Sequence, residues 1–322
     1  MTTRGRDRSA LSTALRGLTG GAGFLIVGLT FGALLGDLWW PLDLLTSFYP
    51  QFAVLLAVLG VLHLALRSPG SGAVMLAVAL INLSIVAPYL VGGGPTAAAD
   101  APRLSVLSFN VGVSNPMRLE VARYVAEERP DLLFVLESSF EWEAALAAAG
   151  PPMSTVAIVP AGQVAGITVM ADPRLLARTL EVGFAGPGEA AAVEVSLEGR
   201  RIVVLAIHPP SPTSGARAAR RDAILAAAGD WVASVDAPVL VVGDCNTTPW
   251  SHAFRALQVR GGLFDTARVA GIQPSWPSGW GPAMIPIDQA LHTEGLALVE
   301  RHTGPSLGSA HRPLLVTVAA TG

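Results

Sequence analysis

Three long stretches without a charged side chain occupy the first hundred residues, and they constrain the fold more than any other feature of this 322-residue chain. They hold 20 residues between Arg16 and Asp37, 23 between Asp43 and Arg67, and 32 between Arg67 and Asp100. A helix needs about 20 apolar residues to cross the hydrocarbon layer of a membrane. None of the stretches has the polar face that an amphipathic helix of a soluble domain shows. The sequence therefore predicts a membrane anchor over residues 1–92 with three transmembrane helices.

The distribution of arginine predicts how this anchor is oriented. Four arginines precede the first span, and Arg67 lies in the short turn between the second and third spans. The turn between the first two spans instead carries two aspartates and the aromatic residues Trp39, Trp40 and Tyr49, which suit a membrane interface. Because basic residues favour the cytoplasmic side, we expect a multi-pass protein of the cell membrane with a cytoplasmic N-terminus. Three crossings then place the C-terminal domain outside the cytoplasm.

The remainder of the chain is expected to form a linker, residues 93–102, and one soluble domain, residues 103–322. The linker follows from the glycine, proline and alanine of residues 92–99. From Ala101 onward there are 16 arginines and 20 acidic residues, a net charge of −4. A polynucleotide backbone is bound most readily by a basic surface, so nucleic acid is an unlikely partner.

Hydrophobic patterning in the soluble domain predicts an α/β fold. Strands are expected at residues 104–109, 132–136, 166–170, 191–197, 201–207, 239–242, 285–291, 296–300 and 313–319. Helices are expected from Asn115-Pro116 to Pro130 and over residues 214–235. Since only some strands are separated by helices, two packed sheets fit this pattern better than one doubly wound parallel sheet.

Polar residues follow the carboxyl ends of several predicted strands. Asn110, Glu137 and His208 each come directly after an apolar run, and Asp244 and Asn246 follow another. Asp288 follows Ile287, and His311 precedes the last strand, which would bring it to the same rim if that strand is antiparallel. Carboxylate and amide oxygens favour Mg²⁺ or Mn²⁺ over zinc, and no organic cofactor is indicated.

The order of these short motifs resembles the endonuclease/exonuclease/phosphatase superfamily over about residues 103–320. The matching segments are Ser108-Phe109-Asn110, Val135-Leu136-Glu137, Ile207-His208-Pro209-Pro210, Gly243-Asp244-Cys245-Asn246, Ile287-Asp288 and Ser309-Ala310-His311-Arg312-Pro313. The resemblance implies a four-layer α/β sandwich, two packed sheets flanked by helices. With three spans in front, the chain resembles the membrane-anchored bacterial branch, which includes teicoplanin-resistance proteins thought to act on undecaprenyl pyrophosphate. Antibiotic resistance is the role that this resemblance implies.

The resemblance also implies a role for each residue. Glu137 would hold the divalent ion with Asn110 close by, and Asp244, helped by Asn246, would orient or deprotonate the attacking water. His311, paired with Asp288, would stabilise the charge that builds on the phosphoryl oxygens, and His208 would contact the same phosphate. Phosphoryl transfer depends on such positioning and charge stabilisation, which is consistent with these residue types.

Four positions depart from the family pattern. Ala310 stands where the family has an aspartate that commonly contributes to the metal site, so weaker metal binding is expected. Gln289 replaces a histidine, Gly112 stands where related nucleases often have a charged residue, and Cys245 replaces a larger apolar residue.

The sequence thus favours a membrane-anchored, extracytoplasmic, metal-dependent phosphohydrolase that acts on a lipid phosphate or pyrophosphate or on a small phosphate ester. Two alternatives stay open at this point. The first is a nuclease. The second is a family member whose altered site serves binding or non-hydrolytic chemistry, as Ala310 and Gln289 suggest.

Overall fold

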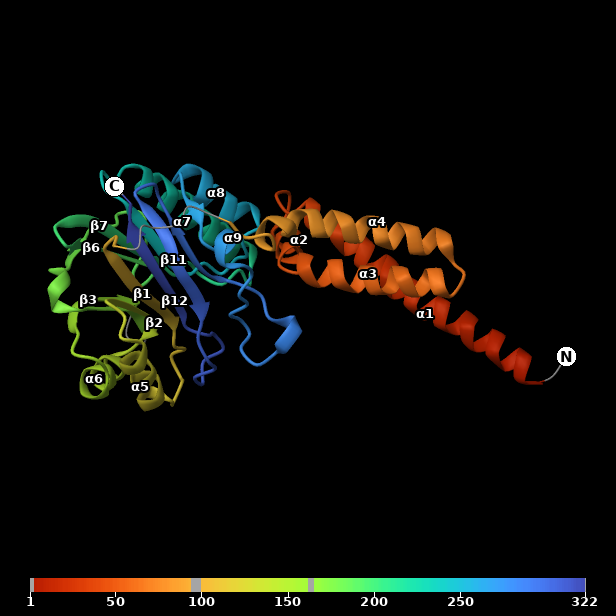
Figure 1. Ribbon diagram of the computed structural model, residues 1–322, viewed down its shortest axis with the longest axis horizontal. Coiled ribbons are helices and arrows are strands. Elements are labelled where there is room, and N and C mark those ends of the chain that lie inside the picture. Colours follow the sequence, from red (N-terminus) through yellow and green to blue (C-terminus); the bar gives the residue numbers. More distant parts are fainter. Residues whose placement is uncertain (1–2, 94–99, 162–164, 322) are drawn as a thin grey trace. The chain divides into compact units, whose positions relative to one another are not determined.

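The chain divides into a helical unit and an α/β unit. A computed structural model describes residues 3–93, 100–161 and 165–321 (Figure 1). The helical unit contains residues 1–88 together with 250–252, and the α/β unit contains residues 89–249 and 253–322. Part of the predicted linker, residues 94–99, lies outside the described residues. The linker bounds therefore stay a prediction.

The helical unit contains segments that are apolar enough to cross a membrane. Its helices are α1 (Thr3–Leu34), α2 (Trp40–Thr46), α3 (Tyr49–Ala65) and α4 (Pro69–Val86), followed by the 3₁₀ turn η1 (Ala87–Tyr89). Two segments, Ser12–Leu34 and Pro69–Tyr89, meet the length and hydropathy of a span. Helices α2 and α3 meet at an angle of 65° and supply a third span if they are counted together.

Small residues let α3 and α4 approach closely. A Cβ atom added to Gly60 would lie 2.7 Å from Leu76, and one added to Gly72 would lie 2.9 Å from the Gly60 carbonyl oxygen. The buried Asn82 of α4 donates its amide to Thr30 Oγ1 of α1 at 3.0 Å. Close glycine contacts and paired polar side chains are typical of helices that pack within a membrane.

Two six-stranded sheets form the centre of the α/β unit. Sheet A has the order β11-β12-β1-β2-β4-β3, and sheet B has the order β5-β6-β7-β8-β10-β9. The strands are β1 (Arg103–Asn110), β2 (Leu132–Ser138), β3 (Ser154–Ala161), β4 (Ala165–Ala171), β5 (Arg178–Leu180), β6 (Ala190–Leu197), β7 (Arg200–Ile207), β8 (Val239–Asp244), β9 (Phe264–Asp265), β10 (Asp288–His292), β11 (Leu296–Thr303) and β12 (Leu314–Ala320). The helices are α5 (Arg118–Glu128), α6 (Phe140–Ala149), α7 (Gly215–Ala233), α8 (His252–Arg260) and α9 (Ala267–Ala270), with 3₁₀ turns η2 (Pro173–Leu175) and η3 (Gly281–Ala283).

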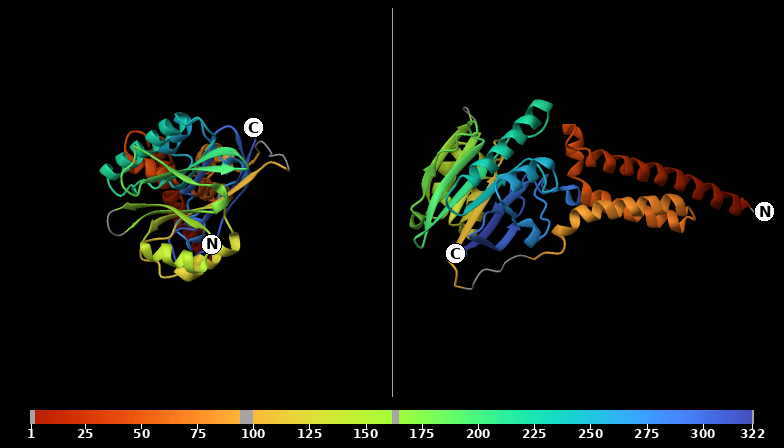
Figure 2. Two further views of the ribbon diagram at one scale, coloured as in Figure 1. Left: turned by 90° about the vertical axis from the view of Figure 1, so that its left-hand side faces the viewer. Right: turned by 90° about the horizontal axis from the view of Figure 1, so that it is seen from above.

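The sheets pack face to face with helices on both outer faces, so the expected four-layer sandwich is confirmed (Figure 2). The core between the sheets includes Phe134, Val204 and Val316. Helices α5 and α6 cover the outer face of sheet A, and α7 and α8 cover that of sheet B. Strands with both faces covered must be apolar throughout, which explains the continuous apolar runs in β2 and β8.

Each sheet has one pair of parallel strands at its centre. Strand β1 runs parallel to β2, and β7 runs parallel to β8. The carboxyl ends of parallel neighbours meet at one edge. Strand β12 is antiparallel to β1, as was expected if His311 is to reach the site. The segment before β12, which contains His311, therefore lies near the carboxyl end of β1.

Two predicted boundaries were wrong. Helix α5 begins at Arg118 instead of Asn115-Pro116, because the Asn115 side chain closes a turn onto the Met117 N–H at 3.0 Å. Strand β10 begins at Asp288 instead of Ile285, since Pro286 has no N–H and Ile285 forms an isolated bridge with Trp276. Asp288 is therefore the first residue of its strand.

Candidate active site

Asn110 and Glu137 reach the site from the ends of β1 and β2. Asn110 pairs with Leu136 in the parallel register, and its amide nitrogen lies 3.0 Å from Glu137 Oε1. The β2–β4 register shifts between Leu136 and Ser138, and Glu137 adopts a φ of 54° there. Positive φ is uncommon for a glutamate and is often found where a bulge redirects a side chain at a functional site. The Glu137 side chain remains about one-third exposed.

Asp244 and Asn246 follow β8 in a turn that its backbone makes possible. A Cβ atom on Gly243, whose φ is 133°, would lie 2.1 Å from the Ile207 carbonyl oxygen, so only glycine fits there. Asp244 Oδ1 accepts the Asn246 N–H at 2.9 Å, and Oδ2 accepts the Asn110 amide at 3.1 Å. Burial raises the pKa of Asp244. The carboxylate is therefore fixed by amides from both sheets.

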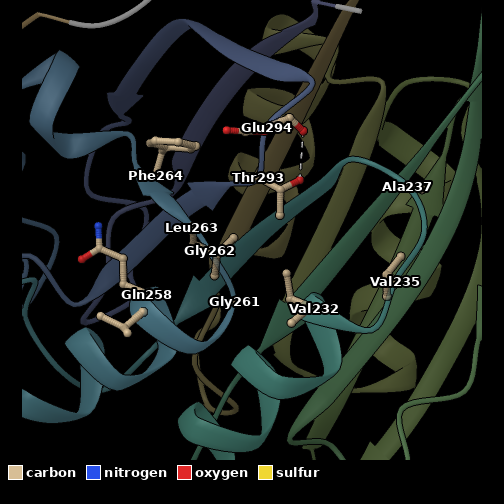
Figure 3. A pocket seen from close by; sticks show the side chains of 12 residues that line it. Val232, Val235, Ala237, Gln258, Gly261, Gly262, Leu263, Phe264, Thr293 and Glu294 are labelled. Carbon is tan, nitrogen blue, oxygen red and sulfur yellow. Dashed lines mark hydrogen bonds between the residues drawn. The ribbon is translucent and has the colours of Figure 1, made fainter.

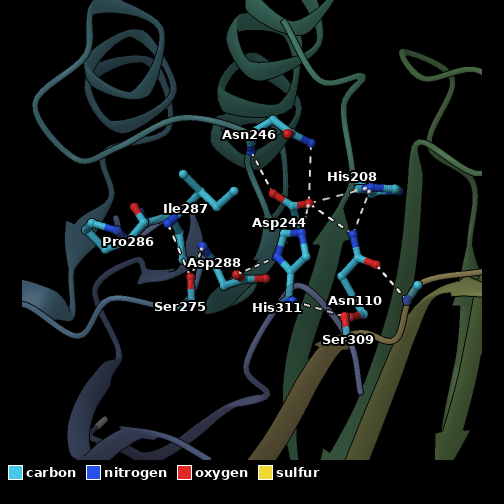
Figure 4. Close-up of polar contacts among 12 residues, drawn as sticks. Asn110, His208, Asp244, Asn246, Ser275, Pro286, Ile287, Asp288, Ser309 and His311 are labelled. Atoms are coloured by element: carbon cyan, nitrogen blue, oxygen red, sulfur yellow. Dashed lines mark hydrogen bonds and ion pairs between the residues drawn. The ribbon is translucent and has the colours of Figure 1, made fainter. Parts of the chain in front are cut away.

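His311 and Asp288 form a buried hydrogen-bonded pair (Figure 4). His311 Nδ1 lies 2.9 Å from Asp288 Oδ2, and His311 Nε2 lies 3.6 Å from Asp244 Oδ2. Burial alone would lower the pKa of His311, but the carboxylates of Asp288 and Asp244 outweigh burial and raise this pKa to about 9. The imidazole is therefore a cation at neutral pH and can donate a hydrogen bond from Nε2.

His208 completes the group of predicted residues. Its Nε2 lies 3.7 Å from both Glu137 Oε1 and Asp244 Oδ2, and 3.4 Å from the Asn110 amide nitrogen. All seven side chains singled out in the sequence thus gather at one rim of the two sheets; Figure 4 shows six of them, all but Glu137.

Several supporting residues were missed by the sequence analysis. Ser275 Oγ accepts the Asp288 N–H at 3.2 Å, and the buried Arg301 of β11 donates to the Asp288 carbonyl oxygen at 3.3 Å. Ser309 Oγ donates to the Asn110 carbonyl oxygen at 2.7 Å and accepts the His311 N–H at 3.0 Å. These contacts join residues that are distant in the chain, so no local motif signals them.

The oxygen atoms at this rim suit a hard divalent cation. Glu137 offers a partly exposed carboxylate, and Asn110 lies beside it. Asp244, Asp288 and His311 also present ligand atoms within 4.8 Å of one another and could hold a metal ion. The donor set is rich in carboxylate oxygen, which fits Mg²⁺ or Mn²⁺.

A hollow of about 740 Å³ elsewhere on the α/β unit has no comparable chemistry (Figure 3). Its only carboxylate is that of Glu294, and none of the seven predicted site residues lines it. It is lined by Val232, Ala233, Val235, Ala237, Gln258, Val259, Gly261, Gly262, Leu263, Phe264, Thr293 and Glu294.

Comparison with known families identifies the α/β unit. The sequence profile of the endonuclease/exonuclease/phosphatase family matches residues 107–311. The chain belongs to this family. Members of the endonuclease/exonuclease/phosphatase family are typically metal-dependent phosphoester hydrolases. The comparison identifies the family and not a branch within it, and a search of curated proteins finds no match.

Solved structures of the endonuclease/exonuclease/phosphatase fold superpose on the α/β unit. A protein of unknown function from Enterococcus faecalis has a TM-score of 0.57 at 15% identity, covering 67% of this chain and 100% of its own. A mannosyl-6-phosphatase from Bacteroides thetaiotaomicron gives 0.54 at 12% identity, with 67% and 99% covered. TDP2 of D. rerio, complexed with a single-strand DNA product, gives 0.56 at 15% identity, with 68% and 99% covered. At these identities the likeness shows the fold.

The departures from the family pattern have different structural settings. Ala310 is exposed, and its carbonyl oxygen accepts the Ser278 N–H at 2.7 Å. Gln289 is fully buried, and its amide donates to the Pro286 carbonyl oxygen at 2.7 Å, so this side chain braces the turn before β10. Cys245 packs in the core between sheet B and its helices.

Proposed function

We propose that this protein is a membrane-anchored, metal-dependent phosphohydrolase that acts outside the cytoplasm on a phosphorylated or pyrophosphorylated lipid. The observation that carries the proposal is the meeting of Glu137, Asp244 and His311 at one rim, in a chain whose N-terminal helices are apolar enough to span a membrane.

The geometry supports a distinct task for each group. Glu137 and Asn110 would hold the divalent ion, which when bound supplies positive charge to the phosphoryl oxygens. Asp244 orients the attacking water and accepts a proton from it. Its raised pKa makes it a better base than an exposed aspartate. Asn246 fixes Asp244 through the hydrogen bond from its backbone N–H.

The charge that develops on the phosphoryl group is met by two imidazoles. The His311 cation is oriented by Asp288 and donates from Nε2. His208, near Glu137 and Asp244, contacts the same phosphate. A fixed donor in a water-poor site costs no reorganisation during the reaction, and loss of one such donor typically lowers kcat by about 10²–10³.

A lipid substrate is favoured over a polynucleotide by charge and by the anchor. The α/β unit has a net charge of −4 from Ala101 onward, which disfavours a polyanionic backbone. The teicoplanin-resistance-type branch, with its undecaprenyl pyrophosphate substrate, remains part of this proposal.

The test is an activity assay of the full chain in detergent with added Mg²⁺ or Mn²⁺. Three substrates are compared: a lipid pyrophosphate, plasmid DNA and a generic phosphate monoester. We expect metal-dependent release of phosphate from the lipid and no cleavage of DNA. DNA cleavage would replace the proposal with a nuclease, and no hydrolysis of any substrate by a folded, metal-supplemented protein would contradict it.

A further inference from the structure

The segment that precedes β10 carries two exposed tryptophans. We call residues 272–287 the Trp loop. Trp276 and Trp280 are 37% and 69% exposed. No charged side chain occurs between Arg268 and Asp288. Single exposed apolar residues are common on proteins, but two indoles within five positions of an uncharged segment form a concentrated apolar surface.

The Trp loop is bonded directly to the residues that flank His311. The Ser278 N–H donates to the Ala310 carbonyl oxygen at 2.7 Å, and the Arg312 N–H donates to the Ser275 carbonyl oxygen at 3.0 Å. Figure 4 shows Ser275, Pro286 and Ile287 of the loop beside Asp288. The loop therefore lies next to the His311–Asp288 pair.

Hydrogen bonds close the base of the Trp loop. Trp276 and Ile285 exchange backbone hydrogen bonds of 3.1 and 2.6 Å, and Ser275 Oγ accepts the N–H groups of Ile287 and Asp288. Within the loop, Met284 and Ile285 are buried, while Trp280 remains exposed. The two indoles thus stand on a backbone that is fixed to the site, and their apolar area is available to a ligand.

A third exposed aromatic residue lies close in the chain to Glu137. Phe140, three positions after Glu137, is 75% exposed at the start of α6. Large apolar side chains thus occur close in the chain to both the predicted metal ligand and the His311–Asp288 pair. The Trp loop beside the site suits a ligand with an apolar part next to its phosphate, because burial of apolar area provides binding free energy and an indole also offers an N–H donor.

We infer that Trp276 and Trp280 form the contact surface for the hydrocarbon part of a phosphorylated amphiphile whose phosphate lies at the His311–Asp288 pair. The inference rests on the proposed phosphohydrolase function and adds the element that selects its substrate. The Trp loop carries no cation that would bind a second anionic group, so it favours a hydrocarbon chain over a polyanion.

The test measures kcat/KM of the full chain in detergent for two phosphate monoesters, butyl phosphate and dodecyl phosphate, with Mg²⁺ present. The wild-type protein should prefer the dodecyl ester. Trp280→Ala should lower kcat/KM for dodecyl phosphate about tenfold and leave butyl phosphate within about twofold. Trp280→Phe, which keeps an apolar ring, should recover most of the loss. Val259→Ala, at an 80% exposed position on α8, is the matched control and should change neither value.

The outcomes separate this inference from the proposed function. If the wild-type protein hydrolyses both esters and Trp280→Ala and Trp276→Ala keep the same preference, the inference is wrong and the phosphohydrolase function stands. Equal loss on both esters would likewise overturn it, since the tryptophans would then act on the catalytic geometry. If the wild-type protein hydrolyses neither these esters nor the lipid pyrophosphate, the proposed function fails and the inference fails with it.

Discussion

The imidazole of His311 donates to the carboxylate of Asp288 across 2.9 Å, and Asp288 in turn is the first residue of its strand. This pair lies on opposite sheets of the sandwich, since Asp288 belongs to β10 of sheet B and His311 precedes β12 of sheet A. The cation on His311 thus depends on how the two sheets meet.

The His311–Asp288 pair predicts a pH dependence. The pKa of His311 is raised to about 9, so the cation is present at neutral pH and activity should fall as the pH rises through about 9. Asp288→Asn removes the largest of the contributions that raise this pKa. The alkaline limb of the kcat profile should then move down by one or more pH units. The measurement is a pH–rate profile of both proteins, with Asp230→Asn on α7 as a surface control, since Asp230 is exposed and pairs with the exposed Arg260. An alkaline limb at the same pH in Asp288→Asn would contradict the assignment.

The predicted metal ligand and the predicted base should respond differently to substitution. Glu137→Gln should lower the rate by about 10² or more and raise the Mg²⁺ concentration for half-maximal activity. Asp244→Asn should lower kcat by about 10²–10⁴ with little change in that concentration, because its task is on the attacking water. Metal titrations of activity test both. Equal metal dependence in the wild type and Glu137→Gln would show that Glu137 is not the main ligand.

The turn after β8 should tolerate no side chain at Gly243. Its φ of 133° and the 2.1 Å distance from an added Cβ to the Ile207 carbonyl oxygen predict that Gly243→Ala destabilises the α/β unit by about 3 kcal/mol or more. Gly199→Ala is the matched control, because Gly199 also has a positive φ but nothing within 4 Å of an added Cβ. It should cost about 1–2 kcal/mol. Thermal unfolding of the full chain in detergent compares the two, and equal losses would count against the steric argument.

The topology of the anchor can be tested with reporter fusions. If the N-terminus is cytoplasmic and three spans cross the membrane, a C-terminal alkaline phosphatase fusion should be active and a C-terminal fluorescent-protein fusion dark. Fusions that end after Arg67, between the second and third spans, should show the reverse pattern. An active phosphatase after Arg67 would contradict the arginine-based orientation and, with it, the extracytoplasmic substrate.

The alanine at position 310, where the family pattern has an aspartate, leads to a prediction about metal affinity. A divalent ion with few anionic ligands binds weakly, so Ala310→Asp should lower the Mg²⁺ or Mn²⁺ concentration for half-maximal activity several-fold, on the order of tenfold. Ala310→Asn, of similar size but uncharged, is the control. Unchanged metal dependence in an active Ala310→Asp protein would mean that this position does not face the ion. Phosphatase activity near zero in both proteins would favour binding or non-hydrolytic chemistry.

Much of the fold was predictable because it follows from local pattern. The buried strands β2, β7 and β8 are continuous apolar runs, and α7 (Gly215–Ala233) lies within the helix expected over residues 214–235. Edge strand β3, which includes Pro160, and the alanine-rich α6 were not predicted, because neither has a distinct apolar period. Both are defined by the neighbouring elements on which they pack.

The site was predictable only where its residues end strands. Asn110 could be placed beside Glu137, and His208 beside Asp244, because parallel neighbours end at one edge of a sheet. The contact of Arg301 with Asp288 depends on how the two sheets pack against each other. The local sequence of a strand does not indicate which residues of the other sheet it will contact. The bond from Ser275 to Asp288 depends on a loop whose path follows from the Trp276–Ile285 bridge.

The hydrogen bond from Asn110 to Asp244 joins sheet A to sheet B at the candidate active site. In the proposed mechanism each sheet then supplies a different part of the site: the proposed metal ligands Glu137 and Asn110 belong to sheet A, and the proposed base Asp244 belongs to sheet B. A ligand that contacts residues of both sheets would therefore link them. Its binding should stabilise the packing of the two sheets against each other. Conversely, a substitution in the core between the sheets that shifts one sheet relative to the other should abolish the proposed activity, although every polar side chain of the site is retained.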